Sequence, residues 1–477
     1  MKFIFLGQLF VRFFCYFYAL SFGSLRMNRK LFFNSNIIMK KAKRIVVWFR
    51  KDLRLHDNEA LTEAIENSEE VIPIYVFNEE ELMGATPYDV QKTGCFRTQF
   101  LLESVAHLQD KLRKKGIDLV IRMGKPEEEV FKLVQEVEAS YVYANMERTH
   151  DEVLVQNSLE KNLWSAGLEI LFFRGKMLYY TQDLPFPIAH SPDTFSTFRK
   201  EVERFVMIRE PLPEPTNFTT WTIDIEHRDL PTLKELGHEK KTQDGRGDLQ
   251  FEGGEAAGLN RLLTYFGAER YLDNFVDSRY ELKGTNVASR LSPWLALGCL
   301  SPKEVYAQLK KYEKKYKSNK STQTFLLELL WRDHYRLMGK KYGDKIFEEG
   351  GIRGQETKNL SEDIIVFNQW KEGKTEVNLI NACMLQLKNT GFLSHKGRQL
   401  VSSYLVNDMG IHWRMGATYF QHILIDYDIC SNWVNWNVVG GVGPDTKEDR
   451  YLNIENQAKR FDSKGDYTDL WLGSVCS

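Results

Sequence analysis

Several signatures that would fix the class of this protein at once are missing from its 477 residues. The six cysteines form no CxxC pair and no Cys/His cluster with zinc spacing, which excludes a zinc module and a disulfide framework. There is no GxGxxG phrase, and so no standard dinucleotide fingerprint. Lys and Arg number 64 against 65 Asp and Glu, so nucleic-acid binding would need a local basic patch.

Acidic residues are absent from the first 43 positions. An apolar stretch over Phe3–Phe22 contains Arg12, which argues against a membrane span, and the cleavage pattern of a signal peptide is weak. An acidic-poor, arginine-bearing extension is also typical of a transit peptide. We favour a start codon assigned too early, with Met27 or Met39 as the true start. Residues 1–43 are therefore an extension of uncertain status on an otherwise cytoplasmic protein, with organelle targeting left open.

Residues 44–173 alternate short apolar runs with helical patterns. Strands are expected at Ile45–Phe49, Val71–Phe77, Ile117–Ile121, Tyr141–Ala144 and Leu168–Phe173. Helices are expected between them at Glu59–Asn67, Cys95–Lys115, Pro126–Glu138 and Asp151–Ala166. This alternation predicts an α/β domain with a parallel, Rossmann-like sheet that is covered on both faces.

Downstream of this domain the pattern changes twice. Residues 174–250 are rich in proline and polar residues and are interpreted as an interdomain linker or functional strap. Residues 251–477 carry helical periodicity and predict an all-α domain. Its helices are expected at Ala256–Phe266, Pro302–Tyr316, Thr324–Met338, Val377–Leu387, Gly397–Met409 and Ala417–Asp426.

Two motifs combine charge with a position suited to ligands. The phrase WFRKDLRLHDN (48–58) follows the first strand, and open α/β sheets bind ligands beyond strand ends; an ordinary charged loop is the alternative. In GTNVASRLSPWLALGCLSP (284–302), Ser289 and Ser292 flank Arg290 before a helix that Pro293 can open. Hydroxyls, a guanidinium and free helix N–H groups suit a phosphate, whereas simple N-capping by Ser292 would explain the same pattern.

Two further motifs lie in the helical region. In ELLWRDH (328–334), Glu328 and Trp331 share a helix face that could line a pocket; an amphipathic helix with a Glu–Arg pair is the alternative. Asp426 and Asp428 precede a segment rich in Asn and Trp. They could suggest a metal site, but no third ligand lies nearby and Arg398 could neutralise one of them. We therefore expect no metal, and a pair of carboxylates that binds a cofactor.

Together these motifs resemble the photolyase/cryptochrome family. The phrases 48–58, FEGGEAAGLNRL (251–262), 289–302, 328–334, TGFLSHKGRQLVSSYLVND (390–408) and DYDICSN (426–432) fall in the family's order. The GGE, SPWLALGCLSP and DYD elements are most similar to the cryptochrome DASH branch. The resemblance implies an antenna-type α/β domain, a helical domain holding FAD, and 5,10-methenyltetrahydrofolate as a second chromophore. It also implies a lyase activity, the light-driven repair of cyclobutane pyrimidine dimers, mainly in single-stranded DNA.

The resemblance also implies roles for single positions. It implies flavin contacts for Ser289, Arg290, Leu291, Ser292, Arg332, Arg398, Asp426, Asp428 and Asn432. Glu328 would hydrogen-bond the dimer carbonyl, Trp331 would stack on the dimer, and Asn432 would face flavin N5. Electron transfer is implied for Trp436 and Trp413, antenna contacts for Asp151 and Glu152, and a DNA phosphate contact for Lys396.

The sequence departs from the family pattern at five positions. Leu360 stands where the distal tryptophan of the electron-transfer triad is expected, and Val438 stands where the branch usually has Tyr. The others are His395 for Asn, Phe275 for Tyr and Asn381 for Asp. These changes put photoreduction and repair in doubt more than flavin binding.

Three functions therefore remain. The first is a monomeric photolyase-like enzyme without stable membrane association, and the second is a photoreceptor that signals through flavin redox state. The third is a dark nucleotide- or RNA-binding protein. The chain ends soon after Trp436, without the long tail of signalling plant cryptochromes, and this favours the enzyme.

Overall fold

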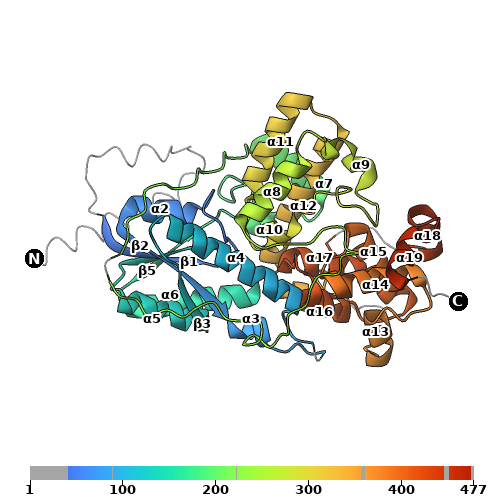
Figure 1. Ribbon diagram of the computed structural model, residues 1–477, viewed down its shortest axis with the longest axis horizontal. Helices are drawn as coiled ribbons and strands as arrows, with labels where there is room; N and C mark the ends of the chain where they lie inside the picture. Colours follow the sequence, from blue (N-terminus) through green and yellow to red (C-terminus); the bar gives the residue numbers. More distant parts are fainter. Residues whose placement is uncertain (1–40, 89, 222, 356–359, 445–450, 474–477) are drawn as a thin grey trace, which may run out of the picture. The chain divides into compact units, whose positions relative to one another are not determined.

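Five parallel strands form one sheet in the order β3-β2-β1-β4-β5 (Figure 1). The computed structural model describes residues 41–88, 90–221, 223–355, 360–444 and 451–473. The strands are β1 (Ala42–Phe49), β2 (Ser68–Asn78), β3 (Val120–Gly124), β4 (Tyr141–Asn145) and β5 (Glu169–Phe173). The parallel sheet is confirmed, and each strand lies within three residues of its expected start and finish. The expectations for residues 1–40 lie outside the described residues.

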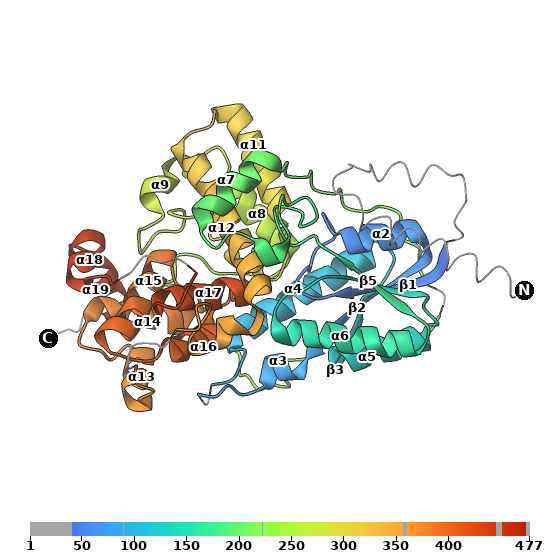
Figure 2. The same cartoon turned by 180° about the vertical axis from the view of Figure 1, so that it is seen from behind.

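Helices cover both faces of this sheet, as the alternating pattern predicts. One face packs against α2 (Glu59–Asn67) and α4 (Cys95–Lys114) through Ile45, Val47 and Phe49. The other packs through Val46 and Trp48 against α5 (Pro126–Glu136) and α6 (His150–Ser165), which lie in front of the sheet in Figure 2. Alternate residues of β1 thus enter different cores, so every residue from 45 to 49 is apolar and buried.

From residue 255 onward the described chain is helical (Figure 1). The longer helices are α8 (Glu255–Tyr265), α11 (Pro302–Tyr316), α12 (Lys320–Tyr342), α13 (Ile364–Lys371), α14 (Asn378–Thr390), α15 (His395–Ser403), α16 (Trp413–Ile423), α17 (Ile429–Val439) and α18 (Ile454–Phe461). Short helices lie between them: α9 (Phe275–Ser278), α10 (Ser292–Ala296), a π-helical turn (Tyr404–Asp408) and α19 (Asp466–Leu472). The predicted all-α architecture is confirmed.

Several helices were not expected from the sequence, and two of them, α7 and α17, carry residues of the candidate site. The segment 174–250 contains α7 (Phe195–Phe205), so it is not wholly a strap. Helix α17 has the sequence ICSNWVNWNVV, and Ile, Val, Asn and Trp are mediocre helix formers. Its formation depends on packing, because Val434 and Trp436 are buried, and on the N-cap Asp428, whose carboxylate accepts the N–H of Ser431 at 2.8 Å.

Residues from 42 onward form one compact unit. Within it, the loop after β1 contacts both the sheet domain and the helical domain. Arg54 is 1% exposed and donates to the carbonyl oxygens of Gly298 at 2.8 Å, Asp57 at 2.9 Å and Gly175 at 3.0 Å. Asp57 accepts from Lys303 at 2.6 Å at the start of α11. The charged phrase 48–58 is therefore a buried junction rather than an exposed charged loop.

Gly298 offers a test of this junction. Its φ is +68°, and a Cβ there would collide with the carbonyl oxygen of Lys51 and lie 2.7 Å from the Cα of Asp52. We expect Gly298→Ala to lower the free energy of unfolding by more than about 4 kcal/mol, measured by urea denaturation. Gly167→Ala is the control: its φ is +74° but no atom lies within 4 Å, so only the left-handed backbone cost of about 1–2 kcal/mol applies. Equal losses would contradict the close approach.

Candidate functional site

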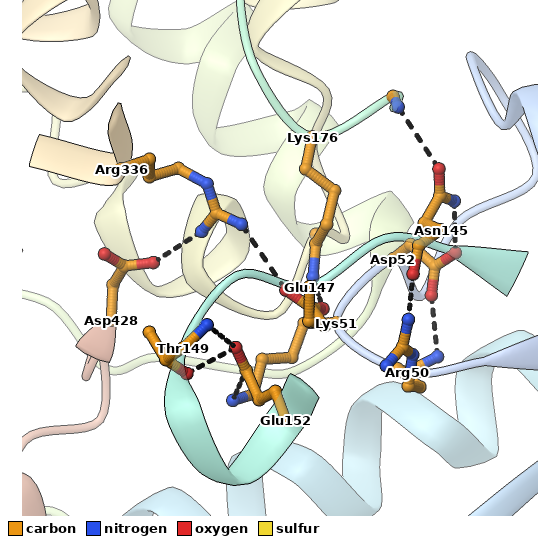
Figure 3. Close-up of polar contacts among 12 residues, drawn as sticks. Arg50, Lys51, Asp52, Asn145, Glu147, Thr149, Glu152, Lys176, Arg336 and Asp428 are labelled. Atoms are coloured by element: carbon orange, nitrogen blue, oxygen red, sulfur yellow. Dashed lines mark hydrogen bonds and ion pairs between the residues drawn. The ribbon is translucent and has the colours of Figure 1, made fainter. Parts of the chain in front are cut away.

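Charged side chains gather at the carboxyl-terminal edge of the sheet, where β1 and β4 end (Figure 3). Lys51 Nζ lies 2.8 Å from Glu152 Oε1, and Glu152 also accepts the hydroxyl of Thr149 at 2.6 Å in the capping box of α6. Burial acts to raise the pKa of Glu152, but Lys51 and Lys176 overcome it and hold that pKa well below its usual range. The predicted antenna residue Glu152 is therefore an ionised, paired carboxylate, whereas Asp151 is exposed.

A second set of charges continues from this edge into the helices (Figure 3). Glu147 pairs with Lys176 and with Arg336 of α12, whose other arm contacts Asp428 at 2.9 Å. Lys176, Glu147 and Arg336 are each no more than 6% exposed. Burial lowers the pKa of Lys176 to about 8, against the attraction of Glu147. Burial also acts to lower the pKa of Arg336, but the negative charges of Asp428 and Glu147 outweigh it, and the pKa is raised.

Asp426 is the centre of the predicted flavin site. Both of its oxygens accept from Arg398 of α15 at 2.8 Å, and one also accepts the hydroxyl of Ser292 at 2.6 Å. Asp426 is 7% exposed. The structure thus joins three predicted site residues that are up to 134 positions apart in sequence. Ser292 is the first residue of α10 and not its N-cap, and its hydroxyl donates to Asp426, so N-capping does not explain this serine.

Other predicted flavin contacts are engaged with the protein itself. Arg290, whose φ is +54°, contacts Asp248 at 2.7 Å and the carbonyl of Gly284 at 2.8 Å. Its charge is already neutralised, so this arrangement does not support its predicted phosphate contact. Arg332 donates to the carbonyl oxygens of Lys176 at 2.8 Å and Leu295 at 3.1 Å, again within the protein. Leu291 is buried, and the carbonyl of Ser289 accepts from Arg261 at 2.8 Å.

Asn432 and Asp428 lie on one helix, α17. Asn432 is 8% exposed, and its amide donates to the carbonyl of Ala417 at 3.0 Å. The Asp428 carboxylate is shared between the N-cap contacts to Ser431 and the ion pair with Arg336. Asp428 therefore fixes the helix that carries Asn432 and Trp436, and a direct flavin contact by Asp428 stays a prediction.

The predicted dimer-contacting residues lie on α12. Trp331 stacks on Phe195 of α7 with ring centroids 3.7 Å apart and planes 8° apart, so one face of the indole is covered by the protein. Glu328 pairs with Arg279, and its side chain is 43% exposed. Desolvation by surrounding protein raises the pKa of Glu328, and Arg279 partly opposes the rise. The Nε of Arg279 is buried without a hydrogen-bond partner in the described part of the chain, which fits a ligand oxygen.

The two predicted electron-transfer tryptophans, Trp436 and Trp413, are both buried. Both lie where α16 packs against α17: the Trp436 ring approaches Gly416 of α16, and the Trp413 ring approaches Gly440, the C-cap of α17. The Trp413 ring meets Trp433 edge-on at 6.0 Å, and Trp433 donates to the Tyr427 hydroxyl at 3.1 Å. Leu360 is half-buried beside a bridge between Ser361 and Ile411.

Two of the unusual residues have local explanations. Asn381 accepts the N–H of Thr375 and donates to its carbonyl, both at 2.8 Å, which an aspartate could not do in both directions. Phe275 packs edge-on against Phe325 at 5.5 Å. Desolvation, together with the cations around it, lowers the pKa of His395 to about 4, so it is neutral at pH 7.

Lys396 is largely buried, which does not favour its predicted contact with a DNA phosphate. It is 6% exposed, and its ammonium lies 4.7 Å from the ring centre of Phe461 in α18. The phosphate contact stays a prediction. Burial, with Arg460 nearby, lowers the pKa of Lys396, which is the expected effect on an ammonium without a carboxylate partner.

Some residues of the site were missed in the sequence analysis. Glu147, Lys176 and Arg336 carried no motif; only the position of Glu147 beyond a strand end could have pointed to it. Phe195 was hidden in the segment expected to be linker. No three His, Cys, Asp or Glu side chains within the described ranges are placed to hold a metal ion. Nor is any helix of those ranges both long and apolar enough to cross a membrane.

Comparison with known proteins matches both halves of this architecture. Residues 45–216 match the family model "DNA photolyase" and residues 325–476 match "FAD binding domain of DNA photolyase". A cryptochrome DASH from Gloeobacter violaceus is 42% identical over 430 residues, covering 90% of this chain and 85% of that protein. The chloroplastic/mitochondrial cryptochrome DASH of Arabidopsis thaliana is 39% identical, covering 92% and 77%.

Solved structures agree. A cryptochrome from Synechocystis sp. PCC6803 superposes with a TM-score of 0.87 at 38% identity, covering 91% of this chain and 89% of that one. A class III photolyase from Agrobacterium tumefaciens gives 0.77 at 26% identity, covering 92% and 88%. The fold and site are those of a flavoprotein with an α/β domain ahead of a helical FAD-binding domain. The chain belongs to the photolyase/cryptochrome family, and within it is similar to cryptochromes DASH.

The Asp426 cluster provides a test of flavin binding. We expect the wild type to carry about one non-covalent FAD per chain, released on denaturation. Asp426→Asn leaves Arg398 without its carboxylate, and we expect FAD affinity to fall at least about tenfold, because breaking a buried charge pair costs about 2–5 kcal/mol. The measurement is the flavin-to-protein absorbance ratio after dialysis. Asp244→Asn, in an exposed pair with Arg246, is the control. Full retention by Asp426→Asn would remove this cluster from the flavin site.

Proposed function

We propose that this protein is a blue-light and UV-A flavoprotein that repairs cyclobutane pyrimidine dimers, preferentially in single-stranded DNA, as a monomer. The observation that carries the proposal is the convergence on α17. Helices α12, α15 and α16 all pack against it. These helices carry the residues on which the proposal rests: Glu328 and Trp331 on α12, Arg398 on α15, Trp413 on α16, and Asn432 with Trp436 on α17.

The residues of this region fit FAD and a flipped dimer. Asp426 and Arg398 form a polar anchor, and Ser292 fixes the carboxylate. When bound, FAD would supply the photoexcited electron. The indole of Trp331 would stack on an extruded dimer, and base stacking of this kind is worth about 1–3 kcal/mol per base. Desolvation raises the pKa of Glu328, which favours its protonated form, and in that form Glu328 would donate a hydrogen bond to the dimer carbonyl, where negative charge develops.

The sheet edge supports a second chromophore. We assign 5,10-methenyltetrahydrofolate to it, with Glu152 and Asp151 as contacts. The buried Nε atoms of Arg50 and Arg336 lack partners among the described residues, so the edge has unused donors. The protein would act in the cytoplasm, whereas the plant relatives are named as chloroplastic or mitochondrial.

A photoreceptor without repair is the second candidate. It is favoured by Leu360 and Val438, which stand where aromatic residues are expected from the resemblance to the cryptochrome DASH branch. The fully reduced protein discriminates between the two: dimer loss in oligo(dT) under blue light supports the enzyme, and its complete absence supports the photoreceptor.

Glu328 is the residue to test for repair. We expect Glu328→Ala to lower the repair rate at least about tenfold while FAD stays bound, because a hydrogen bond to the developing charge is lost. Glu328→Gln keeps a donor and should retain more activity. Repair by the wild type should fall as pH rises through the raised pKa of Glu328, whereas Glu328→Gln should lack that limb. Glu203→Gln, in an exposed pair on α7, is the control. Equal rates for wild type and Glu328→Ala would remove Glu328 from the active site.

Leu360 is the residue to test for photoreduction. An electron hole that stops at buried Trp413 lies close to the flavin, so charge recombination competes with external donors and photoreduction should be weak. Leu360→Trp should raise the steady-state yield under blue light with a thiol donor. A high wild-type yield that Leu360→Trp leaves unchanged would overturn this. Phe substitutions would then locate the route, through Trp433, next to Trp413, or through buried Trp370.

A further inference from the structure

The hairpin that joins α11 to α12 carries a dense run of positive charge. Residues 310–320 contain six lysines and one glutamate, whereas the whole chain has a net charge of −1. All six lysines are exposed, and the hairpin stands at the upper end of the helical region in Figures 1 and 2. We call this group the basic tip, and its members are Lys310, Lys311, Lys314, Lys315, Lys317 and Lys320.

Two carboxylates contact this hairpin, and both are already engaged. Glu313 pairs with Lys310 at 2.7 Å and also accepts two hydroxyl groups of the hairpin. Asp273, beside the hairpin, contacts Arg270 and accepts a tyrosine hydroxyl and an asparagine amide. Apart from Lys310, no lysine side chain of the basic tip makes a hydrogen bond or ion pair with another described residue. Most of the positive charge is therefore left to the solvent.

The placement of these lysines works against the stability of the hairpin. Lysines four residues apart on α11 repel each other. Lys320 is the first residue of α12, where the helix dipole disfavours a cation, and no acid lies in that first turn. Lys317, the C-cap of α11, has a φ of +70°, a conformation that favours glycine. Only Lys314 and Lys315, in the last turn of α11, are favoured by a helix dipole. Helix stability alone does not explain the basic tip.

The basic tip offers charge rather than an apolar surface. The ammonium of Lys310 lies 5.4 Å from the ring centre of Tyr306, and Tyr316 meets Lys315 at 4.8 Å and Arg270 at 4.9 Å. Both rings are thus engaged by cations. None of the exposed large hydrophobic side chains of the described ranges lies on α11 or α12. A membrane surface needs an apolar face to insert, whereas a phosphate backbone needs only cations, so a nucleic acid is the better partner.

One face of α12 connects the basic tip to the predicted dimer contacts. Along this face lie, in order, Lys320, Thr324, Leu327, Glu328 and Trp331, all exposed or half-buried. Eight residues of helix separate Lys320 from Glu328, a distance of about 12 Å along the axis. A strand with phosphates about 3.4 Å apart crosses that distance in about three or four nucleotides. A strand held at Glu328 can therefore reach the basic tip.

We propose that the basic tip binds the phosphate backbone of single-stranded DNA that flanks a dimer held at Glu328 and Trp331. The tip holds the strand without reading its bases, because it presents ammonium groups and no free ring. The choice of DNA as partner rests on the proposed function. Binding at the tip itself requires neither light nor repair, so it can be measured in the dark on undamaged DNA.

The test compares the wild type with a triple variant, Lys311→Gln/Lys314→Gln/Lys317→Gly. Full-length protein of recorded FAD content is titrated in the dark into labelled oligo(dT) of about 16 nucleotides, followed by fluorescence anisotropy. We expect affinity to fall at least about tenfold. The slope of log affinity against log salt should become shallower by about 2, because each phosphate contact of a single strand contributes about 0.7.

The control removes the same number of exposed lysines from the segment 174–250, as Lys234→Gln/Lys240→Gln/Lys241→Gln. Its net charge equals that of the triple variant, and it should bind like the wild type. Equal affinity of the wild type and the triple variant would overturn the proposal, and so would an equal loss in the control. Phosphatidylserine vesicles test the other partner: wild type that binds these vesicles but no oligo(dT) would also overturn it.

The thermal midpoint separates a contact from a structural role. Lys317→Gly alone should melt no lower than the wild type, because glycine suits a φ of +70°, yet it should bind oligo(dT) more weakly. A lysine needed for folding would instead lower the midpoint and the affinity together, and that result would contradict the proposal. If the triple variant does not fold, Lys317→Gly replaces it under the same criteria.

Failure of this proposal is distinguishable from failure of the proposed function. A protein that repairs dimers, but whose triple variant binds oligo(dT) like the wild type, would reject only the basic tip. A protein that binds through the tip but repairs nothing would reject only the enzyme. If both hold, the triple variant should raise KM for a dimer in a strand of about 16 nucleotides but not in one of about 4, with kcat unchanged in both.

Discussion

The Arg54 guanidinium holds the sheet and the helices together, and both candidate sites depend on that contact. Each of its bonds ends on a backbone carbonyl, from the β1 loop, from the segment after β5 and from the turn after α10. A buried guanidinium needs such a set of acceptors, since its desolvation is otherwise uncompensated. Gly298 lets the turn approach the β1 loop because a side chain there would collide with it. The edge of the sheet and the start of α11 are thereby fixed relative to each other.

Helix α17 depends on a second constraint of the same kind. Its sequence has little intrinsic helix propensity, so its position is set by Asp428 at the N-terminus and by packing against α12 and α16. Asp428 caps the helix with one oxygen and holds Arg336 with the other. The residues that would face the flavin and carry the electron hole therefore take their orientation from the ion pair at the N-terminus of α17.

The sequence predicted the parts of this structure that rest on local periodicity. In the α/β domain, each strand and helix has an apolar pattern with the period of its own secondary structure. Such local patterns locate the elements closely, and β4 was predicted within one residue. Arg398 was expected to neutralise one of two aspartates, and the structure pairs it with Asp426. Helix α17 was missed because packing overrides its propensity. The partners of Arg290, Lys396 and Glu147 come from segments distant in sequence, and no local pattern encodes which charge neutralises which.

Arg336 links the α/β domain and the helical domain electrostatically. Its two arms contact Glu147 at the sheet edge and Asp428 at the start of α17, and all three groups are largely buried, where charges are weakly screened. Because Asp428 also caps α17, the charge balance at the sheet edge and the position of Asn432, one turn along that helix, depend on the same guanidinium.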